Sequence, residues 1–363
     1  MWSGWFSLLH NKPISPFLAP FSFASFLYGK AVLARIFLYE KGILKRRKVP
    51  GAVISVGNIT TGGTGKTPAV IMLARWAADN GFSVAVLSRG YGGKRKENLL
   101  LVSDTKNILS CAEEAGDEAF LLARRLPGVP VLVSKQRYLA AMAAIARWKA
   151  DLFILDDGFQ HVRLDRQADL VLLDAAMPYG NGWLLPLGPL REPIAQLRRA
   201  DALILTRSEN DSSPDPMPLI KFDFPGLSVF RATHLPEKVV FPKSGEDRPI
   251  DFLSGKRVMG FAGIGRPGAF LKTLKSLGAD VVDFLAFGDH HNYGPADIAR
   301  ISDIARSRSG ALLVTTEKDW VRIANLAGGL EKVCYVSIQF KILGDEEAFF
   351  SLIKRLIAEK KGD

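Results

Sequence analysis

The sequence predicts an α/β protein whose main parallel sheet is covered by helices on both faces. Residues 57–68 (GNITTGGTGKTP) form a glycine-rich turn between an apolar stretch, 52–56, and a helical pattern, 69–76. Short, continuously apolar segments alternate with helical patterns from there to residue 207, which is typical of strands buried on both faces of a parallel sheet. One of these strands ends in Asp156 and Asp157.

The composition narrows the possible partners and compartment. The chain has 363 residues, 48% of them hydrophobic, which is enough for two domains or one large one. Its net charge of +11 favours an anionic partner: nucleic acid, an anionic membrane surface or a phosphorylated substrate. Nothing besides this charge supports nucleic acid, since no zinc, helix-turn-helix or RNP pattern occurs. The two cysteines, Cys111 and Cys334, form no disulfide framework, which indicates a reducing compartment.

Residues 1–42 are rich in aromatic and apolar side chains, interrupted by prolines and by Lys12, Lys30 and Arg35. No window offers the ~20 uninterrupted apolar residues of a transmembrane helix, and no secretory signal is expected. A basic cluster, 45–48 (KRRK), closes the segment. This pattern favours a helix lying in a membrane interface above anionic headgroups. The alternative is an N-terminal helix packed on the domain, and the two can coexist.

The order strand, glycines, Lys-Thr and helix at 57–76 is typical of a phosphate-binding loop. Backbone N–H groups wrap the phosphates, Lys66 supplies a cation, and the Thr67 hydroxyl can hold Mg²⁺. Thr60 stands where a standard Walker A loop has its first glycine, and Thr61 where ParA-like ATPases have their signature lysine. The predicted phosphate-binding residues are Thr60, Thr61, Gly62, Gly63, Thr64, Gly65, Lys66 and Thr67.

Two further segments follow strand ends, where open α/β sheets bind ligands. Residues 83–88 read as a buried strand, and Arg89 directly after it is a candidate for contact with an anionic substrate. Gly116 and Asp117 open a helix that runs to residue 125. Carboxylates at a helix start are often only caps, so the residues alone leave a cap and a chemical role for Asp117 both open.

Residues 151–161 (DLFILDDGFQH) have the Walker B arrangement, an apolar strand ending in acids. A carboxylate at this strand tip can hold Mg²⁺ directly or through water. Adjacent side chains alternate across a strand, so we expect one of Asp156 and Asp157 at the metal and the other to orient a neighbour. The Gly- and Pro-rich stretch 180–193 is expected to form a wall of the site, with Arg191 and Glu192 pointing inward.

The second half of the chain contains a further α/β unit. Residues 227–234 read as a strand, 237–248 as a polar loop, and 257–277 as strand, turn and helix. Later strands are expected at 311–316 and 333–340, followed by a basic amphipathic helix at 346–360. The segment 287–293 (FGDHHNY) contains two adjacent histidines.

Together these motifs resemble the tetraacyldisaccharide 4′-kinase family, the lipid A kinases of Gram-negative bacteria. The phosphate loop is not specific to this family, but the full set, in this order across nearly the whole chain, is. The motifs are 57–68, LSRGY at 87–91, GDE at 116–118, LDDGFQH at 155–161, PLREP at 189–193, FGDH at 287–290 and TTEKD at 315–319.

The resemblance implies a P-loop α/β/α domain and a smaller α/β/α domain joined by a two-stranded linker. On this basis we expect a hydrophobic, basic membrane-associating segment at 1–48 and a P-loop kinase domain at 49–225. These are followed by a linker at 226–245, a smaller α/β domain at 246–345 and a C-terminal basic helix at 346–363. The strands near 227–234 and 333–340 are candidates for the two linker strands.

The resemblance also implies transfer of the γ-phosphate of ATP, with Mg²⁺, to the 4′-hydroxyl of a tetraacyl glucosamine disaccharide 1-phosphate, giving lipid IVA. Asp117 would take the hydroxyl proton, assisted by His290; the family's Asp-His pair favours His290 over His291. Substrate contacts are expected from Arg89, Tyr91, Gln160, Arg191 and Glu192. The enzyme would lie on the cytoplasmic face of the inner membrane as a peripheral or monotopic protein, with no nucleic acid and no obligate protein partner.

The main rival is a ParA/MinD-like ATPase that switches on a membrane or on DNA. It would explain the unusual loop, the positive charge and the amphipathic segment. It explains neither an Asp117–His290 pair nor a second domain. In addition, Thr61 stands where that group has its signature lysine.

Overall fold

The structure, a computed structural model, describes residues 19–208, 215–308, 311–330 and 332–359. A larger domain contains the predicted parallel sheet, whose strands follow the spatial order β7-β6-β1-β5-β2-β4-β3. They are β1 (Ala52–Gly57), β2 (Val84–Ser88), β3 (Leu99–Ser103), β4 (Val131–Ser134), β5 (Leu152–Asp156), β6 (Ala168–Asp174) and β7 (Ala202–Thr206). β3, which the sequence analysis did not predict, pairs antiparallel with β4.

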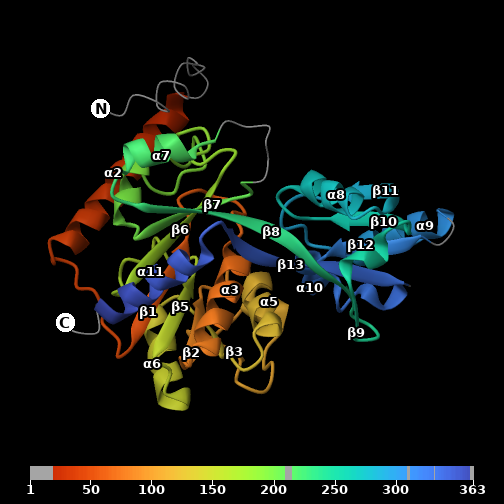
Figure 1. Cartoon of the computed structure of the whole chain (residues 1–363), viewed down its shortest axis with the longest axis horizontal. Helices are drawn as coiled ribbons and strands as arrows, with labels where there is room; N and C mark the ends of the chain where they lie inside the picture. The colour runs from red at the N-terminus through yellow and green to blue at the C-terminus, as the bar shows by residue number, and fades with distance from the viewer. Residues whose placement is uncertain (1–18, 209–214, 309–310, 331, 360–363) are drawn as a thin grey trace.

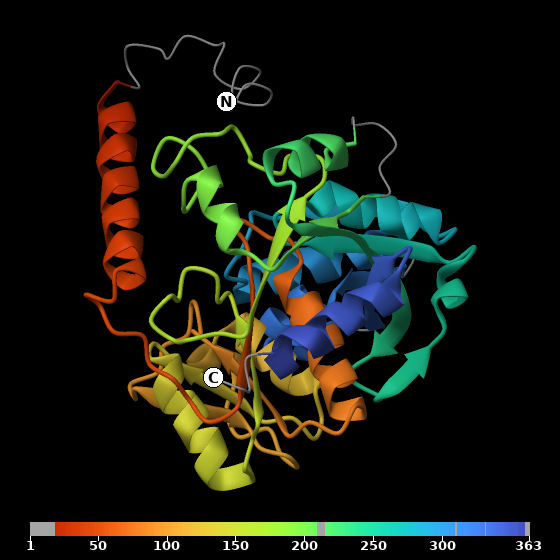
Figure 2. The ribbon, with the colours of Figure 1, turned by 60° about the vertical axis from the view of Figure 1, so that its left-hand side comes forward.

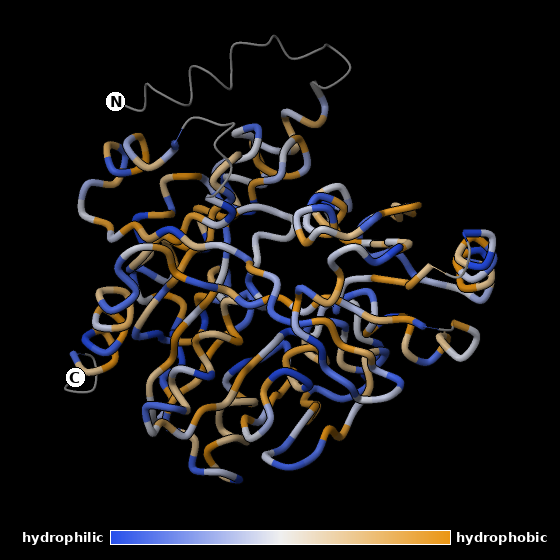
Figure 3. The backbone as a smooth tube through the Cα atoms, turned by 45° about the vertical axis from the view of Figure 1, so that its right-hand side comes forward, coloured by the Kyte–Doolittle hydropathy of each residue, from blue (hydrophilic) through white to orange (hydrophobic). Residues whose placement is uncertain are grey.

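Helices cover both faces of this sheet, which confirms the predicted fold class. On β5, Leu152 and Ile154 join one buried cluster, and Phe153 and Leu155 join another, as the two-residue period of a strand requires. The first cluster includes residues of α3 (Lys66–Asp79), α5 (Asp117–Arg125) and α11 (Glu346–Glu359). The opposite face is covered by α6 (Arg137–Trp148), η2 (Ile194–Arg199) and α7 (Met217–Asp223). Figure 3 shows hydrophobic stretches along the strands between these helices.

The smaller domain lies at the other end of the same sheet (Figure 1). Its strands are β9 (Glu246–Arg248), β10 (Arg257–Ala262), β11 (Asp280–Ala286) and β12 (Leu312–Thr316), with the order β11-β10-β12. Its helices are η3 (Ile250–Leu253), α8 (Pro267–Ser276), α9 (Pro295–Ser307), α10 (Glu317–Ile323) and η4 (Ala327–Gly329). Buried residues of α8 pack on one face and those of α9 and α10 on the other.

Two long strands join the domains: β8 (Ser228–Phe241) and β13 (Val333–Leu343). They pair antiparallel over most of their length, while β8 also pairs with β7 and β13 with β12. The result is one thirteen-stranded sheet that runs through both domains. The predicted polar loop at 237–248 is wrong, because β8 continues to Phe241 and turns into β9. The polar Glu237 in this part of β8 is explained by ion pairs with Arg75 and Arg125 of the larger domain.

The N-terminal helix α2 (Ala19–Glu40) stands along one side of the larger domain (Figure 2). One face packs on the domain: Ser25 Oγ donates to Leu184 O at 2.9 Å, and Tyr28 Oη to Arg191 O at 2.8 Å. By length and composition alone this helix could cross a membrane. Lys30 and Arg35 interrupt the apolar run in the sequence, so its pattern did not predict a membrane-spanning length. The aromatic stretch within residues 1–18 lies outside the described residues.

Candidate functional site

The predicted phosphate-binding loop wraps the N-terminus of α3. Gly62 and Gly65 have φ of 103° and 90°, in the left-handed region that favours glycine. The side-chain amide of Asn58 donates to Thr64 Oγ1 at 3.1 Å and to Gly62 O at 3.4 Å, which fixes the loop from inside. Because α3 begins at Lys66, residues 60–67 surround the free N–H groups of a helix N-terminus, a site for anions.

Two residues that the sequence analysis did not single out support this loop. Arg207, directly after β7, donates from Nη2 to Gly63 O at 2.7 Å and from Nη1 to Asp174 at 2.5 Å. His234 of β8 lies against Gly65 so closely that a Cβ at that glycine would be 2.1 Å from its Nε2. Burial, with help from the nearby Arg207 charge, lowers the pKa of His234 to about 4, so this histidine is neutral at pH 7.

Asp157 connects the loop lysine to the predicted wall of the site. The strand β5 ends at Asp156, and Asp157 turns with a φ of 52°. Its carboxylate lies 3.5 Å from Lys66 Nζ and accepts from Arg191 Nη1 at 2.8 Å. Burial opposes ionisation of Asp157, but the charges of Lys66 and Arg191 outweigh it and lower its pKa. Asp157 is therefore a carboxylate held by two cations.

Asp156 has the properties of a metal ligand. It is buried, and Ser88 Oγ donates to its Oδ2 at 3.1 Å, whereas Oδ1 has no hydrogen-bond partner among the described residues. Burial, together with Glu118 and Asp157, raises the pKa of Asp156 to about 7. No cluster of three or more His, Cys, Asp or Glu occurs in the described part of the chain. Mg²⁺ needs no such cluster, since it keeps waters and takes phosphate oxygens. Asp156 and Thr67, which follows the loop after the neighbouring strand β1, therefore fit this ion.

The predicted acid Asp117 starts α5 and faces the smaller domain. Arg322 Nε of α10 donates to Asp117 Oδ2 at 2.6 Å. The next residue, Glu118, pairs with Lys318 of α10 at 3.1 Å. Burial opposes ionisation of Glu118, but Lys318 and Lys66 together lower its pKa. Because α5 and α3 pack on the same face of the sheet, the start of α5 lies on the same side of the sheet as the helix that follows the phosphate-binding loop.

The structure distinguishes the two adjacent histidines. His290 contacts Arg322 Nη2 through Nδ1 at 3.1 Å and lies 3.5 Å from Lys318 through Nε2. His291 points elsewhere: it pairs with Asp297 at 3.0 Å and packs against the Phe287 ring. His290 is therefore the histidine beside Asp117, and Arg322 lies between the two.

The glycine- and proline-rich stretch 180–193 lies beside the phosphate-binding loop. Thr60 and Leu190 form a β-bridge, and Thr61 N donates to Pro189 O at 2.7 Å. Arg191 reaches Asp157, but Glu192 is buried and pairs with Arg199. Burial raises the pKa of Glu192, although Arg199 opposes this effect.

The remaining predicted substrate residues are spread around this region. Gln160 Nε2 donates to Asn58 O at 2.9 Å, and Gln160 lines a small pocket with Arg191, Tyr28 and Arg35. Tyr91 is 75% exposed, with its ring centroid 6.2 Å from that of His290. Arg89 is exposed at the end of β2.

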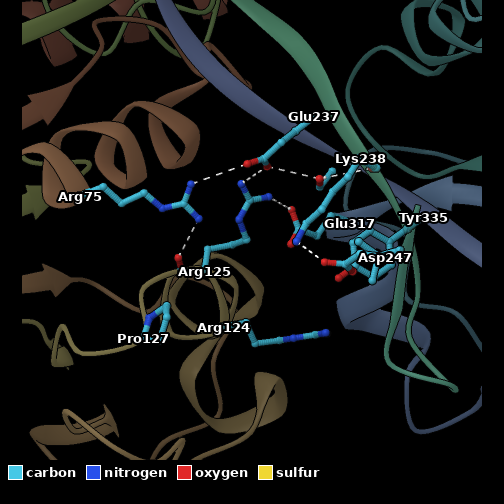
Figure 4. Close-up of a pocket in the computed structure, with 11 residues that line it drawn as sticks. Arg75, Arg124, Arg125, Pro127, Glu237, Lys238, Asp247, Glu317 and Tyr335 are labelled. Atoms are coloured by element: carbon cyan, nitrogen blue, oxygen red, sulfur yellow. Dashed lines mark hydrogen bonds and ion pairs between the residues drawn. The ribbon is translucent and has the colours of Figure 1, made fainter. Parts of the chain in front are cut away.

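A cavity of about 250 Å³ lies between the domains, away from the predicted site residues (Figure 4). Arg125 of α5 fills part of it and pairs with Glu317 of α10 at 2.8 Å and with Glu237 of β8 at 2.5 Å. The opposite charges at the centre of this cavity pair with one another across the domain interface, so the cavity marks a point where the two domains are held together.

A glycine-rich loop on a helix N-terminus, a lysine within it and carboxylates at the adjacent strand tip define a P-loop nucleotide-binding protein. The model of the tetraacyldisaccharide-1-P 4′-kinase family matches residues 14–358. This chain belongs to that family, which confirms the resemblance seen in the motifs.

Relatives with this activity in their names match over most of their length. The tetraacyldisaccharide 4′-kinase of Syntrophus aciditrophicus is 43% identical over 341 residues, which are 92% of this chain and 91% of the relative. That of Pelobacter propionicus is 41% identical and covers 90% and 87%. Among solved structures, an "apo" form of LpxK from Aquifex aeolicus in complex with ATP has a TM-score of 0.76 and 37% identity. The match covers 94% of this chain and 98% of the Aquifex aeolicus chain.

These comparisons make the chain an ATP-dependent lipid A 4′-kinase, a phosphotransferase. They do not favour the rival, an ATPase switch on a membrane or on DNA. A lipid A precursor is the acceptor class that the family implies, and an exposed apolar helix is consistent with membrane association.

Proposed function

We propose that the γ-phosphate of ATP passes to the 4′-hydroxyl of a tetraacyl glucosamine disaccharide 1-phosphate, giving lipid IVA, in the space between the phosphate-binding loop and the start of α5. The observation that carries this is that α3, which begins at Lys66, and α5, which begins at Asp117, cover the same face of the sheet. The Lys66 charge also helps to lower the pKa of Glu118, the residue next to Asp117. A nucleophile activated at α5 would meet a phosphate held at α3.

We assign the nucleotide to residues 60–67. The loop N–H groups and Lys66 would stabilise negative charge on the β- and γ-phosphates as the bond breaks. Thr67 and Asp156 would hold Mg²⁺, which supplies charge neutralisation on these phosphates when bound. Asp157 would act on the metal site indirectly, because Lys66 and Arg191 already hold its carboxylate. In this division Asp156 binds the metal, and Asp157 orients the neighbouring Lys66.

We assign proton abstraction to Asp117 with His290. A sugar hydroxyl is a poor nucleophile at neutral pH, and a carboxylate within hydrogen-bond reach can accept its proton as attack proceeds. His290 supports this role because burial, with the charges of Lys318 and Arg322, lowers its pKa and leaves the imidazole neutral. Its φ of 56° is unusual for a non-glycine residue and is typical of strained positions in functional sites.

We place the acceptor along the wall formed by Arg191 and Gln160, with Tyr91 beside His290 and Arg89 at the end of β2 as further contacts. Arg191 and Gln160 line a pocket that also contains Tyr28 and Arg35 of α2. The acceptor headgroup would thus lie beside the helix with the exposed apolar face. Glu192 would contribute through its neighbours, since it is buried against Arg199.

We propose that α2 associates with the cytoplasmic face of the inner membrane while it remains packed on the domain. Its exposed apolar residues are Phe21, Phe23, Phe26, Leu27, Leu33 and Phe37. The basic cluster at 45–48 that follows is exposed as well, and such cations attract anionic headgroups. This arrangement makes the protein peripheral or monotopic, and the acyl chains of the lipid acceptor would stay in the bilayer. No nucleic acid and no obligate protein partner is part of this proposal.

We also propose functional units at 1–48, 49–225, 226–245, 246–345 and 346–363. The linker strands would permit the smaller domain, with His290, to close on the larger one.

Thin-layer chromatography tests the proposed reaction. The protein is incubated with γ-labelled ATP, Mg²⁺ and the tetraacyldisaccharide 1-phosphate in mixed micelles, and the expected label is on the lipid. ATP hydrolysis that bare vesicles or DNA stimulate, without labelled lipid, would instead support the switch.

A further inference from the structure

Arg322 is buried between the two residues to which we assign proton abstraction. Its side chain is 6% exposed. Nε donates to Asp117 Oδ2 of the larger domain at 2.6 Å, and Nη2 donates to His290 Nδ1 of the smaller domain at 3.1 Å. One planar guanidinium therefore contacts both members of the pair across the domain interface.

Buried partners in the smaller domain fix the orientation of this guanidinium. Nη1 donates to Gly263 O at 2.7 Å and lies 3.3 Å from Asp319 Oδ1. Asp319 is itself fully buried and accepts from Tyr293 Oη and Thr316 Oγ1. A lysine has no rigid fork and cannot make these contacts together. Asp117 thus contacts the Arg322 guanidinium, whose position is fixed by residues of the smaller domain.

The contact between α5 and α10 does not depend on Arg322 alone. Lys318 pairs with Glu118 near the same end of α5. At the far end of α5, Arg125 pairs with Glu317, the first residue of α10 (Figure 4). These two pairs hold α10 on α5, so we expect the domains to stay docked when Arg322 is replaced.

We propose that Arg322 is a positioning residue for phosphoryl transfer, which holds Asp117 and His290 in a fixed relation across the domain interface. The proposal rests on the roles proposed above for Asp117 and His290.

Arg322 also acts on the charge state of His290. The groups around this imidazole are Arg322 and Lys318 of α10, Glu118 of α5, Asp289 beside it and the Tyr91 ring. Desolvation and the two cations lower the pKa of His290, against Asp289 and Glu118.

Two substitutions separate the charge of Arg322 from its geometry. Arg322→Gln removes the charge and keeps a hydrogen-bonding group, whereas Arg322→Lys keeps the charge and loses the fork. Arg308→Gln is the control, because Arg308 pairs with Asp283 within the smaller domain and is 51% exposed. For each protein, kcat and the KM for ATP are measured from pH 5 to 9, together with the melting temperature and ATP binding.

We expect both Arg322 variants to lose about tenfold or more in kcat while the KM for ATP changes less than about threefold. Only Arg322→Gln should move the acid limb of the kcat profile to higher pH, because a cation near His290 is gone. Arg308→Gln should resemble the wild type. An Arg322→Gln enzyme with wild-type kcat and pH profile overturns the inference. The inference is also overturned if kcat falls only in proportion to a fall in melting temperature while the pH profile of kcat stays unchanged, because that result indicates a purely structural role for Arg322. Wild-type protein that does not label the lipid contradicts the proposed function instead.

Discussion

Lys66 Nζ lies 3.5 Å from Asp157 Oδ1 at the mouth of the phosphate-binding loop, and Arg191 approaches the same carboxylate at 2.8 Å. Asp157 therefore holds the loop lysine in place where the phosphates are expected.

Replacement of this lysine should abolish most of the activity. For Lys66→Met we expect a loss of kcat of about two orders of magnitude or more, because a cation that stabilises the transferring phosphate is gone. Radiometric assay of lipid phosphorylation checks this. Lys354→Met, an exposed lysine of α11, should keep wild-type kcat. Equal activity of the two variants would exclude Lys66 from the site.

Gly65→Ala should disrupt the loop for two reasons. The residue has a φ of 90°, and the new Cβ would lie 2.1 Å from His234 Nε2. We expect ATP affinity, measured by calorimetry, to fall about tenfold or more. The double variant with His234→Ala should remain weak, because the backbone conformation still disfavours alanine. Gly268→Ala, in open space within α8, is the control and should bind ATP normally.

The stability of the protein should depend on pH through its buried histidines. The pKa of His234 is lowered to about 4, first by burial, and that of His161 to about 3, also first by burial. Between pH 6.5 and 4 the unfolded chain binds protons that the native state excludes. The free energy of unfolding should therefore fall as pH falls through this window, by about 1.4 kcal/mol per pH unit for each such histidine.

Urea unfolding of the His234→Gln variant at pH 7, 6 and 5 isolates one of these contributions. The variant should lose stability less steeply than the wild type as the pH is lowered, whatever its stability at pH 7. Identical slopes for the two proteins would show that His234 does not titrate as its burial predicts.

The exposed face of α2 should control membrane binding separately from chemistry. Phe23, Phe26 and Phe37 are 65%, 58% and 52% exposed, so the triple serine variant loses little buried area on folding. We expect it to sediment with anionic vesicles at least about tenfold less than the wild type, because apolar burial in the bilayer is lost. Activity on a detergent-dispersed acceptor should change less than about threefold. Phe222→Ser, which removes an exposed aromatic from α7 instead, should leave vesicle binding unchanged.

Much of the fold follows from local patterns in the sequence. Continuous apolar strands and the turn at 57–68 are enough to predict the parallel sheet and its loop, because burial on both faces leaves a direct signal at each strand. The far part of β8 left no such signal. Glu237 looked like a loop residue because its partners, Arg75 and Arg125, lie more than a hundred positions away in the sequence.

Without the family resemblance, the site could be predicted only where one motif contains all its parts. Residues 60–67 and the two aspartates meet this condition, but Arg207, His234 and Arg322 reach the site from distant strands and helices. One signal was present: Lys318, in the TTEKD segment at 315–319, and Arg322 are four positions apart, on one face of a helix. The family resemblance favoured His290 over His291, and the fold adds a physical distinction, because Asp297 engages His291 whereas His290 contacts Arg322.

The central claim is that Asp117 accepts the proton of the lipid hydroxyl opposite the phosphate-binding loop. Single-turnover phosphorylation by Asp117→Asn, with ATP affinity measured on the same sample, tests it most directly, with Glu113→Gln, an exposed acid of the preceding helix, as control. We predict that the Asp117 variant binds ATP within about threefold of the wild type and transfers phosphate at least about a hundredfold more slowly. Transfer at nearly the wild-type rate would contradict the account.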